Sequence, residues 1–242
     1  MNTMPSFNKI PLLNFSSSEL LSLLPEFHLL EPTHWHFAAG STFVEAQNNE
    51  SLRSILLQGK VFCDSLPVAK FLSWTGIDIT QVRGSDFLNL AITGGMKGKH
   101  FFLGGETESL NLLLARVKTE KQDFKIVGTS DALISLAAYD YEVPIDLIRN
   151  SEADVIWICL GSPKQDFVAA KISLQLNVHC IAIGAALDFY SGYKLEAPLL
   201  LRRAGFEWFF RLISEPRRLW KRYLFGNLAL LRMMFSNTFR KN

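Results

Sequence analysis

The 242-residue sequence lacks several patterns that mark familiar classes of protein. It has only three cysteines, Cys63, Cys159 and Cys180, and their wide spacing excludes a disulfide framework and a zinc site of paired cysteines. Because no apolar run reaches about 18 residues, we expect no bilayer-spanning helix. The first residues lack a charged region followed by an apolar run, so we expect no signal peptide. A reducing cytoplasm is the simplest compartment for such a chain.

Several catalytic motifs are also missing. The absence of G-x-G-x-x-G and of G-x-x-x-x-G-K-[ST] argues against a dehydrogenase and against a nucleoside-triphosphate hydrolase. There is no G-x-S-x-G elbow and no H-E-x-x-H helix. The five histidines have no metal-ligand spacing, and no Asp-x-Asp pair occurs. We therefore expect no obligatory metal and no cofactor.

The charges that are present are unevenly distributed. The formal net charge is only +2, but residues 202–241 hold ten basic and two acidic residues. The rest of the chain holds fifteen basic and twenty-one acidic residues. A basic tail on an acidic body predicts a surface for phosphate or for anionic lipid. Because no recognised nucleic-acid-binding module occurs, we do not expect a nucleic-acid partner.

The middle of the chain alternates between strand-like and helix-like patterns. Short apolar runs that lead into glycine occur at residues 100–103, 124–127, 154–160 and 179–183. Helical patterns lie between them, at residues 107–119 and from about Lys164. Nearly continuous apolar strands are typical of a parallel sheet that is covered on both faces. The sequence therefore predicts an α/β fold, Rossmann-like and doubly wound, with a mostly parallel sheet.

The texture of the sequence changes near residue 197. We predict an α/β core over residues 1–196, which opens with an irregular lead over residues 1–34. Residues 197–242 interleave apolar, aromatic and basic side chains, and Pro216 separates two amphipathic stretches. This pattern predicts a helical, basic C-terminal appendage.

Three glycine-bearing loops, at Gly104-Gly105, Gly161 and Gly184, should gather beyond the carboxyl ends of the strands. Glycine lets a ligand approach backbone N–H groups, and a following helix N-terminus favours an anion. This arrangement fits a nucleotide diphosphate; the alternative is that these glycines only form tight turns. Lys164 and Gln165 would lie in the first turn after Gly161, either beside a ligand or in an exposed polar loop.

Three carboxylates are further candidates for the site. Asp64 comes directly after an apolar run, where it would act either as a general base or as the N-cap of a helix over residues 67–74. Capping preferences alone favour the cap. The same two interpretations apply to Asp86, and Asp188 is a third carboxylate, close to the Gly184 loop.

The basic C-terminal stretch also supports two interpretations, which are compatible with each other. Its arginines would grip a diphosphate. Its aromatic residues, four of which fall in residues 206–210, would rest with the arginines on an anionic bilayer surface. A basic helix face that is merely solvated fits this aromatic content poorly.

The sequence resembles a known family, the WecG/TagA/CpsF glycosyltransferases. The resemblance covers roughly residues 36–228 and is strongest at the C-terminal end. Four blocks carry it: Asp64-Ser-Leu-Pro67 with Arg83-Gly-Ser-Asp86; Phe102-Leu-Gly-Gly105; residues 154–166, ending in Gly161-Ser-Pro-Lys-Gln-Asp166; and residues 184–223, including Gly205-Phe-Glu-Trp-Phe-Phe-Arg-Leu212 and Glu215-Pro-Arg-Arg-Leu-Trp-Lys-Arg-Tyr223.

The resemblance implies an inverting, metal-independent transfer of a hexosamine-type sugar from a UDP-sugar. The acceptor would be a sugar linked to polyprenyl diphosphate, in the synthesis of bacterial surface polysaccharide. The protein would be peripheral, at the cytoplasmic face of the bacterial inner membrane. The alternative is a catalytically inactive nucleotide-binding or membrane-adaptor protein of the same fold. The sequence leaves open whether the chain forms a homo-oligomer.

The resemblance also implies roles for residues. Asp64 would be the base, Arg83 and Gln165 polar groups of the pocket, and the appendage would close over the site. The diphosphate clamp would consist of Arg211 and Arg218, with Lys221 or Arg222. This chain departs from the family pattern at three points: Ser65 stands where glycine is usual, Asp166 where glutamate is usual, and residues 37–42 lack the asparagine of a Thr-x-Asn motif.

Overall fold

A six-stranded sheet forms the centre of the protein in a computed structural model, which describes residues 4–239 except 122, 132–133, 138–139 and 215. All its neighbouring strands run parallel, in the order β4-β3-β10-β9-β5-β6. The strands are β3 (His34–Ala38), β4 (Lys60–Cys63), β5 (Lys99–Leu103), β6 (Lys125–Ser130), β9 (Val155–Ile158) and β10 (His179–Ala182). The predicted apolar runs form four of these strands.

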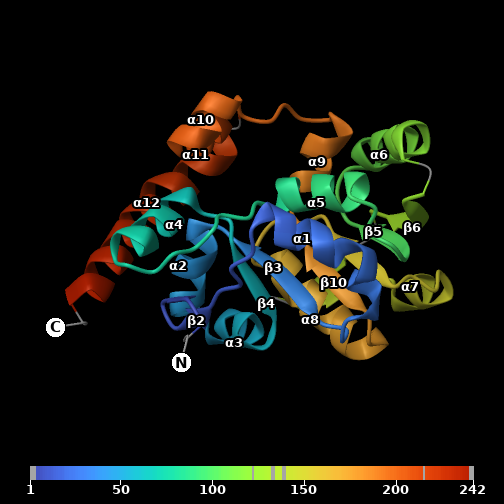
Figure 1. The fold of residues 1–242 in the computed structure, drawn as a ribbon, viewed down its shortest axis with the longest axis horizontal. Coiled ribbons are helices and arrows are strands. Elements are labelled where there is room, and N and C mark those ends of the chain that lie inside the picture. Colours follow the sequence, from blue (N-terminus) through green and yellow to red (C-terminus); the bar gives the residue numbers. More distant parts are fainter. Residues whose placement is uncertain (1–3, 122, 132–133, 138–139, 215, 240–242) are drawn as a thin grey trace.

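Helices cover both faces of the sheet (Figure 1). One face packs against α1 (Ser17–Leu23), η1 (Leu24–Leu29), α5 (Gly84–Thr93), α6 (Thr107–Glu120) and α9 (Ala186–Ser191). The other packs against α2 (Gly40–Asn48), α3 (Glu50–Gln58), α4 (Leu66–Trp74), α7 (Ile145–Asn150) and α8 (Lys164–Leu176). The two-stranded pairs β1 (Ser6–Phe7) with β2 (Ile10–Pro11), and β7 (Ile134–Ala137) with β8 (Asp140–Glu142), lie outside the main sheet.

The strands are buried on both sides because their side chains alternate between two apolar layers. In β9, Val155 and Trp157 enter the layer under α5 and α6, whereas Ile156 and Ile158 enter the layer under α8. This alternation follows from the period of two in a strand, and it explains why the strand sequences are apolar at every position. The predicted doubly wound, parallel α/β fold is confirmed.

Local signals in the sequence fix several helix ends. Ser16 and Glu19 form a capping box at the start of α1, and the helices expected from residue 107 and from Lys164 begin at those residues. Ahead of α1, the first residues are also part of the core, because Phe7, Ile10 and Leu12 are buried against α2 and α3.

The C-terminal stretch is helical, as predicted. It forms α10 (Leu199–Ala204), α11 (Glu207–Ser214) and α12 (Pro216–Phe239). The far end of α12 packs along α2 through Leu230, Met233 and Met234. The two helices come close at Gly40, where a Cβ atom would lie 2.6 Å from Leu230 Cδ2, so a larger residue would require the Leu230 side chain to shift.

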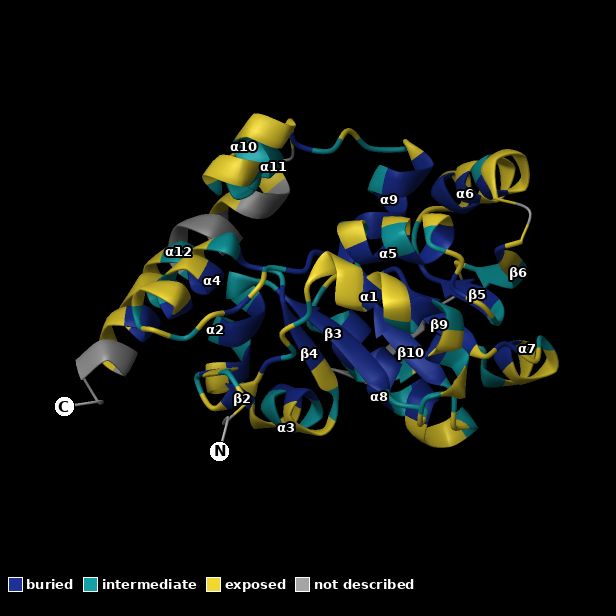
Figure 2. Ribbon diagram, in the orientation of Figure 1, coloured by how far each residue is buried: buried dark blue, intermediate teal, exposed yellow. Residues whose placement is uncertain are grey.

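The outer sides of α10 and α11 are largely exposed (Figure 2). The apolar residues Leu200 and Ile213 are 81% and 64% exposed to solvent. Within the described residues, no helix combines the length and the apolar content that a bilayer crossing requires.

Candidate active site

One pocket of about 790 Å³ opens at the carboxyl ends of the parallel strands. It is lined by the segments that follow β3, β4, β5, β9 and β10, and by α9 and α11. Six of the predicted site residues line it: Asp64, Gly105, Gly161, Gln165, Asp188 and Arg211. The pocket lies where ligands bind in open α/β sheets, and its volume suits a small-molecule site.

The strand order sets out the pocket walls in a row. Asp64 follows β4, Thr42 follows β3, Gly184 follows β10, Ser162 follows β9, and Gly105 follows β5. Because neighbouring strands lie about 4.8 Å apart, the row from β4 to β5 spans roughly 19 Å. An extended ligand can therefore reach from Asp64 at one end to the Gly105 loop at the other.

Asp64 does not cap α4, although N-cap preferences favour that role for it. The N-cap of α4 is the next residue, Ser65, whose Oγ accepts a hydrogen bond from the Val68 N–H at 3.4 Å. Asp64 Oδ2 instead accepts a bond from the N–H of Gly84, the first residue of α5, at 3.3 Å. The carboxylate is thus held at the start of a different helix, with the rest of the group at the pocket wall.

The environment of Asp64 favours its protonated form. Burial, and then the negative charge of Glu207, raise the pKa of Asp64 from 3.8 to about 8. Arg83, the Gly84 N–H and Arg211 act in the opposite direction and are outweighed. A carboxyl group with a pKa near neutrality, in a pocket, is a candidate proton acceptor.

Arg83 holds the C-terminal helices to the core. Its guanidinium, which is buried, contacts Glu196 at 2.6 Å, Glu207 at 3.2 Å and Asp86 at 3.3 Å. Burial lowers the pKa of Arg83, but the carboxylates more than compensate and raise it overall. Arg202 of α10 also pairs with Glu196, at 3.1 Å. These pairs fix the start of α11 beside α5 and so position the pocket residues of α11.

The Gly104-Gly105 loop has a backbone conformation that requires glycine. The φ angles are 86° at Gly104 and 90° at Gly105, in the left-handed region. A Cβ atom on Gly105 would also lie 2.6 Å from Leu187. Both reasons for glycine are structural, and they leave the backbone of Gly105 at the pocket wall.

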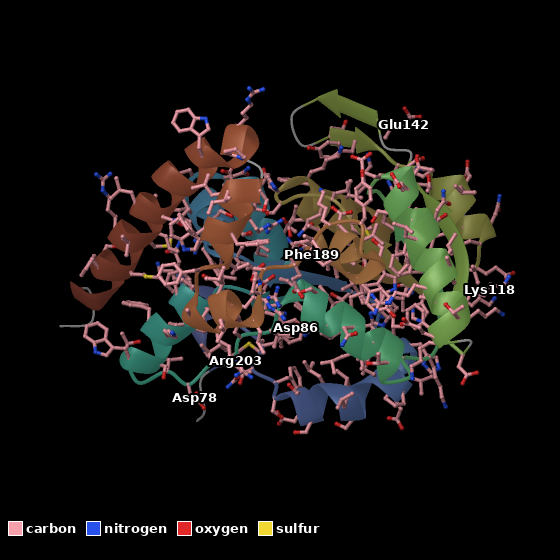
Figure 3. The ribbon with its side chains drawn as sticks, turned by 90° about the horizontal axis from the view of Figure 1, so that it is seen from above. Asp78, Asp86, Lys118, Glu142, Phe189 and Arg203 are labelled. Carbon is pink, nitrogen blue, oxygen red and sulfur yellow. The ribbon has the colours of Figure 1, made fainter. Side chains whose placement is uncertain are left out.

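Helices α9 and α11 close the pocket on a further side. The Arg211 guanidinium lies over the ring of Phe189, with 5.6 Å from Cζ to the ring centroid. Phe189 lies near the middle of the molecule in Figure 3, beside the C-terminal helices. Asp188, at the start of α9, pairs with Lys194 at 2.9 Å. The pocket therefore contains cationic groups as well as carboxylates.

Six predicted site residues lie elsewhere or cannot be placed. Gly104 and Arg83 do not line the pocket, and Lys164 turns towards the ring of Tyr141, 5.0 Å from its centroid. The backbones of Arg218, Lys221 and Arg222 belong to α12, but their side chains lie outside the described part of the structure. The role of each of these residues stays a prediction.

Other pocket residues escaped the sequence-based prediction. Phe37, Thr42, Ser162, Lys194 and Phe210 all line the pocket. Ser162 had a usable signal, since it follows Gly161 at a strand end. Lys194 and Phe210 had none, because their positions depend on how α9 and α11 fold back.

The potential metal ligands and the cysteines of the described residues complete the description of the site. No group of three or more histidine, cysteine, aspartate or glutamate side chains among them could hold a metal ion. All three cysteines are buried and unpaired. Burial raises the pKa of each thiol, that of Cys63 to about 12, which disfavours the reactive thiolate.

A comparison with protein families gives one finding. The model described as the Glycosyl transferase WecG/TagA/CpsF family matches residues 6–242. The matched region begins at the hairpin before α1 and includes the pocket and all three C-terminal helices.

Proposed function

The chain belongs to the WecG/TagA/CpsF family of glycosyl transferases, and on this premise we propose that it moves a hexosamine-type sugar from UDP to a lipid-diphosphate-linked acceptor. The transfer inverts the anomeric centre and uses no metal. The observation that carries this proposal is the pocket itself, in which Asp64, with its raised pKa, shares one cavity with Arg211.

The proposed reaction is one in-line displacement. Asp64 takes the proton from the acceptor hydroxyl, and the hydroxyl oxygen forms a bond to the anomeric carbon of the donor. The bond from that carbon to the diphosphate oxygen breaks, and UDP leaves with the electron pair. A base with a pKa near the working pH suits this proton transfer, because it is partly ionised beforehand and binds the proton well afterwards.

The diphosphate needs cations, because negative charge builds up on the leaving oxygen. Arg211 lines the pocket and would supply one of them. Arg218, with Lys221 or Arg222 on α12, would supply the others. The Gly105 and Gly161 loops would let the nucleotide approach the backbone closely. In a row of roughly 19 Å, the nucleotide would lie towards β5 and the transferred sugar towards Asp64.

The first prediction tests the function directly. Purified protein should be stabilised against heat by UDP and by UDP-sugars of the hexosamine type, because these ligands bind only the folded state. A radiolabelled sugar should then move from the donor to a polyprenyl-diphosphate-linked acceptor. Stabilisation without transfer would favour an inactive nucleotide-binding protein. No stabilisation by any UDP compound would leave only the membrane-adaptor alternative.

We also propose that the protein is peripheral, at the cytoplasmic face of the bacterial inner membrane. The apolar side chains Leu199, Leu200 and Phe206 are all at least half exposed, and Arg203 is exposed beside them. An apolar face bordered by arginines is typical of a helix that lies on an anionic membrane surface.

The second prediction concerns this surface. The protein should float with vesicles of phosphatidylcholine and phosphatidylglycerol, and salt should weaken the binding. Leu200→Glu should reduce flotation strongly, because it puts a negative charge in the apolar face. Leu174→Glu is the matched control, since Leu174 is 76% exposed but belongs to α8. Equal effects of the two substitutions, or no binding at low salt, would contradict the proposal.

A further inference from the structure

A chain of hydrogen bonds leads from the interior of the sheet to the pocket wall. It joins five side chains: His34 Nδ1 to His36 Nε2 at 2.7 Å, His36 Nδ1 to Asp166 Oδ1 at 2.7 Å, Asp166 Oδ2 to Ser162 Oγ at 2.7 Å, and Ser162 Oγ to Thr42 Oγ1 at 3.3 Å. Both histidines and Asp166 are buried, and Thr42 and Ser162 line the pocket.

The carboxylate of Asp166 is the acceptor at the centre of this chain. The two oxygens of the Asp166 carboxylate accept one bond each, from the Ser162 hydroxyl and from His36 Nδ1–H. His36 thus contacts Asp166 through Nδ1 and His34 through Nε2, and the tautomers of the two rings decide which of them donates in the second contact. Burial, and then the neighbouring His36, lower the pKa of His34 to about 4, which keeps that ring neutral. The protons of the Ser162 hydroxyl and of His36 Nδ1 therefore point towards Asp166.

This wall therefore presents hydrogen-bond acceptors to the pocket. The proton of Ser162 is used on Asp166, and that of Thr42 is used on Ser162, so both oxygens turn lone pairs to the pocket. Gln165 lines the pocket beside them. Its Nε2 donates to the Ala182 carbonyl at 3.4 Å, while its Oε1, though buried, has no partner among the described residues. A buried amide oxygen without a partner is costly unless a ligand supplies a donor.

Asp166 also changes the field at the start of α8. It occupies the third position of that helix, where the dipole favours negative charge. Its carboxylate offsets the positive helix end that would otherwise attract a phosphate. A neutral ligand group with hydroxyl or N–H donors therefore fits this wall better than an anion.

We propose that Asp166 is a positioning residue, which acts with His36 to hold Ser162 and Thr42 as hydrogen-bond acceptors for hydroxyl and N–H groups of the transferred sugar. This inference rests on the proposed function, because it assumes a sugar donor in the pocket. It agrees with the row of strand ends, where Thr42 and Ser162 lie between Asp64 and the Gly105 loop. Ala39, which lines the same pocket, has no polar side-chain group, so the two hydroxyls provide hydrogen-bonding groups that Ala39 does not.

Asp166→Asn tests the proposal by reversing one hydrogen bond. With its amide oxygen on His36 Nδ1–H, the new side chain directs its NH₂ group at Ser162 and turns the Ser162 proton into the pocket. KM for the UDP-sugar should rise by about tenfold or more, with a smaller change in kcat, because a donor now meets a donor. Inhibition by UDP, which lacks the transferred sugar, should change less than about twofold. Asp166→Glu, which keeps an acceptor-only group, should restore KM.

Ser162→Ala provides a second test if Asp166→Asn does not fold. It should raise KM for the UDP-sugar in the same selective way. Ser173→Ala is the matched control, because the Ser173 hydroxyl bonds the Val178 carbonyl at the far end of α8. An equal loss of UDP affinity would assign this wall to the diphosphate and overturn the inference. An unchanged KM for the UDP-sugar in both variants would also overturn it. A wild-type protein without transfer would instead overturn the proposed function, and this inference with it.

Discussion

Replacing Asp64 with Asn is expected to lower the rate of sugar transfer by about 10²- to 10⁴-fold, the range of a lost general base. Asn has nearly the same shape and can still accept the hydrogen bond from the Gly84 N–H. It cannot, however, take a proton from the acceptor hydroxyl. The measurement is kcat with saturating donor and acceptor. Asp78→Asn, a change at an exposed carboxylate that does not line the pocket, is the control. A variant that folds normally and keeps the full rate would refute the role as base.

The wild-type enzyme should also show the titration of this base. Only the ionised carboxylate accepts a proton, so kcat should rise with pH and level off above about 8. Asp64→Asn should lack this limb of the profile.

The same substitution is expected to stabilise the protein, more so at high pH. The pKa of Asp64 is about 8 in the folded state against 3.8 as its ordinary value, so between these values the folded state binds more protons than the unfolded state. Wild-type stability therefore falls as pH rises through this interval, and the Asn variant does not share the loss. Melting temperatures between about pH 6 and pH 9 should diverge. Curves that stay parallel would mean that Asp64 is not desolvated.

Arg211→Ala is the second substitution with a large expected effect. Removing a cation from the leaving diphosphate should lower kcat by roughly 10²- to 10³-fold. Arg211→Lys should be intermediate, because an ammonium group keeps the charge but cannot form two parallel bonds to phosphate oxygens. Both rates should be measured in detergent, so that membrane docking does not enter. Arg149→Ala, at an exposed arginine of α7, is the control.

The contact of Arg211 with Phe189 helps to interpret this experiment. α11 is held to α5 by the Glu207–Arg83 pair, so Arg211→Ala should leave α11 in place. Normal transfer in detergent together with weaker flotation would assign Arg211 to the membrane surface alone and remove it from the clamp.

The sequence by itself determined the elements and their class. The apolar runs at residues 154–160 and 179–183 predict buried parallel strands, because only a sheet covered on both faces needs apolar residues at successive positions. Glycine after each run predicts loops at one sheet edge. Asp64 could be placed at a strand end from its neighbours alone. These inferences hold because they depend on periods of two and 3.6 residues, which are local.

Only the tertiary structure decided which side chains meet. In the fold, Ser65 caps α4, whereas Asp64 accepts a hydrogen bond from the N–H of Gly84, twenty residues away. It turned Arg83 towards carboxylates of the C-terminal segment, and it joined His36 to Asp166 across 130 residues of chain. No periodicity encodes such pairs, because they depend on the order of strands in the sheet and on the return of α11 over the strand ends. The acceptor-lined wall at Ser162 exists for that reason.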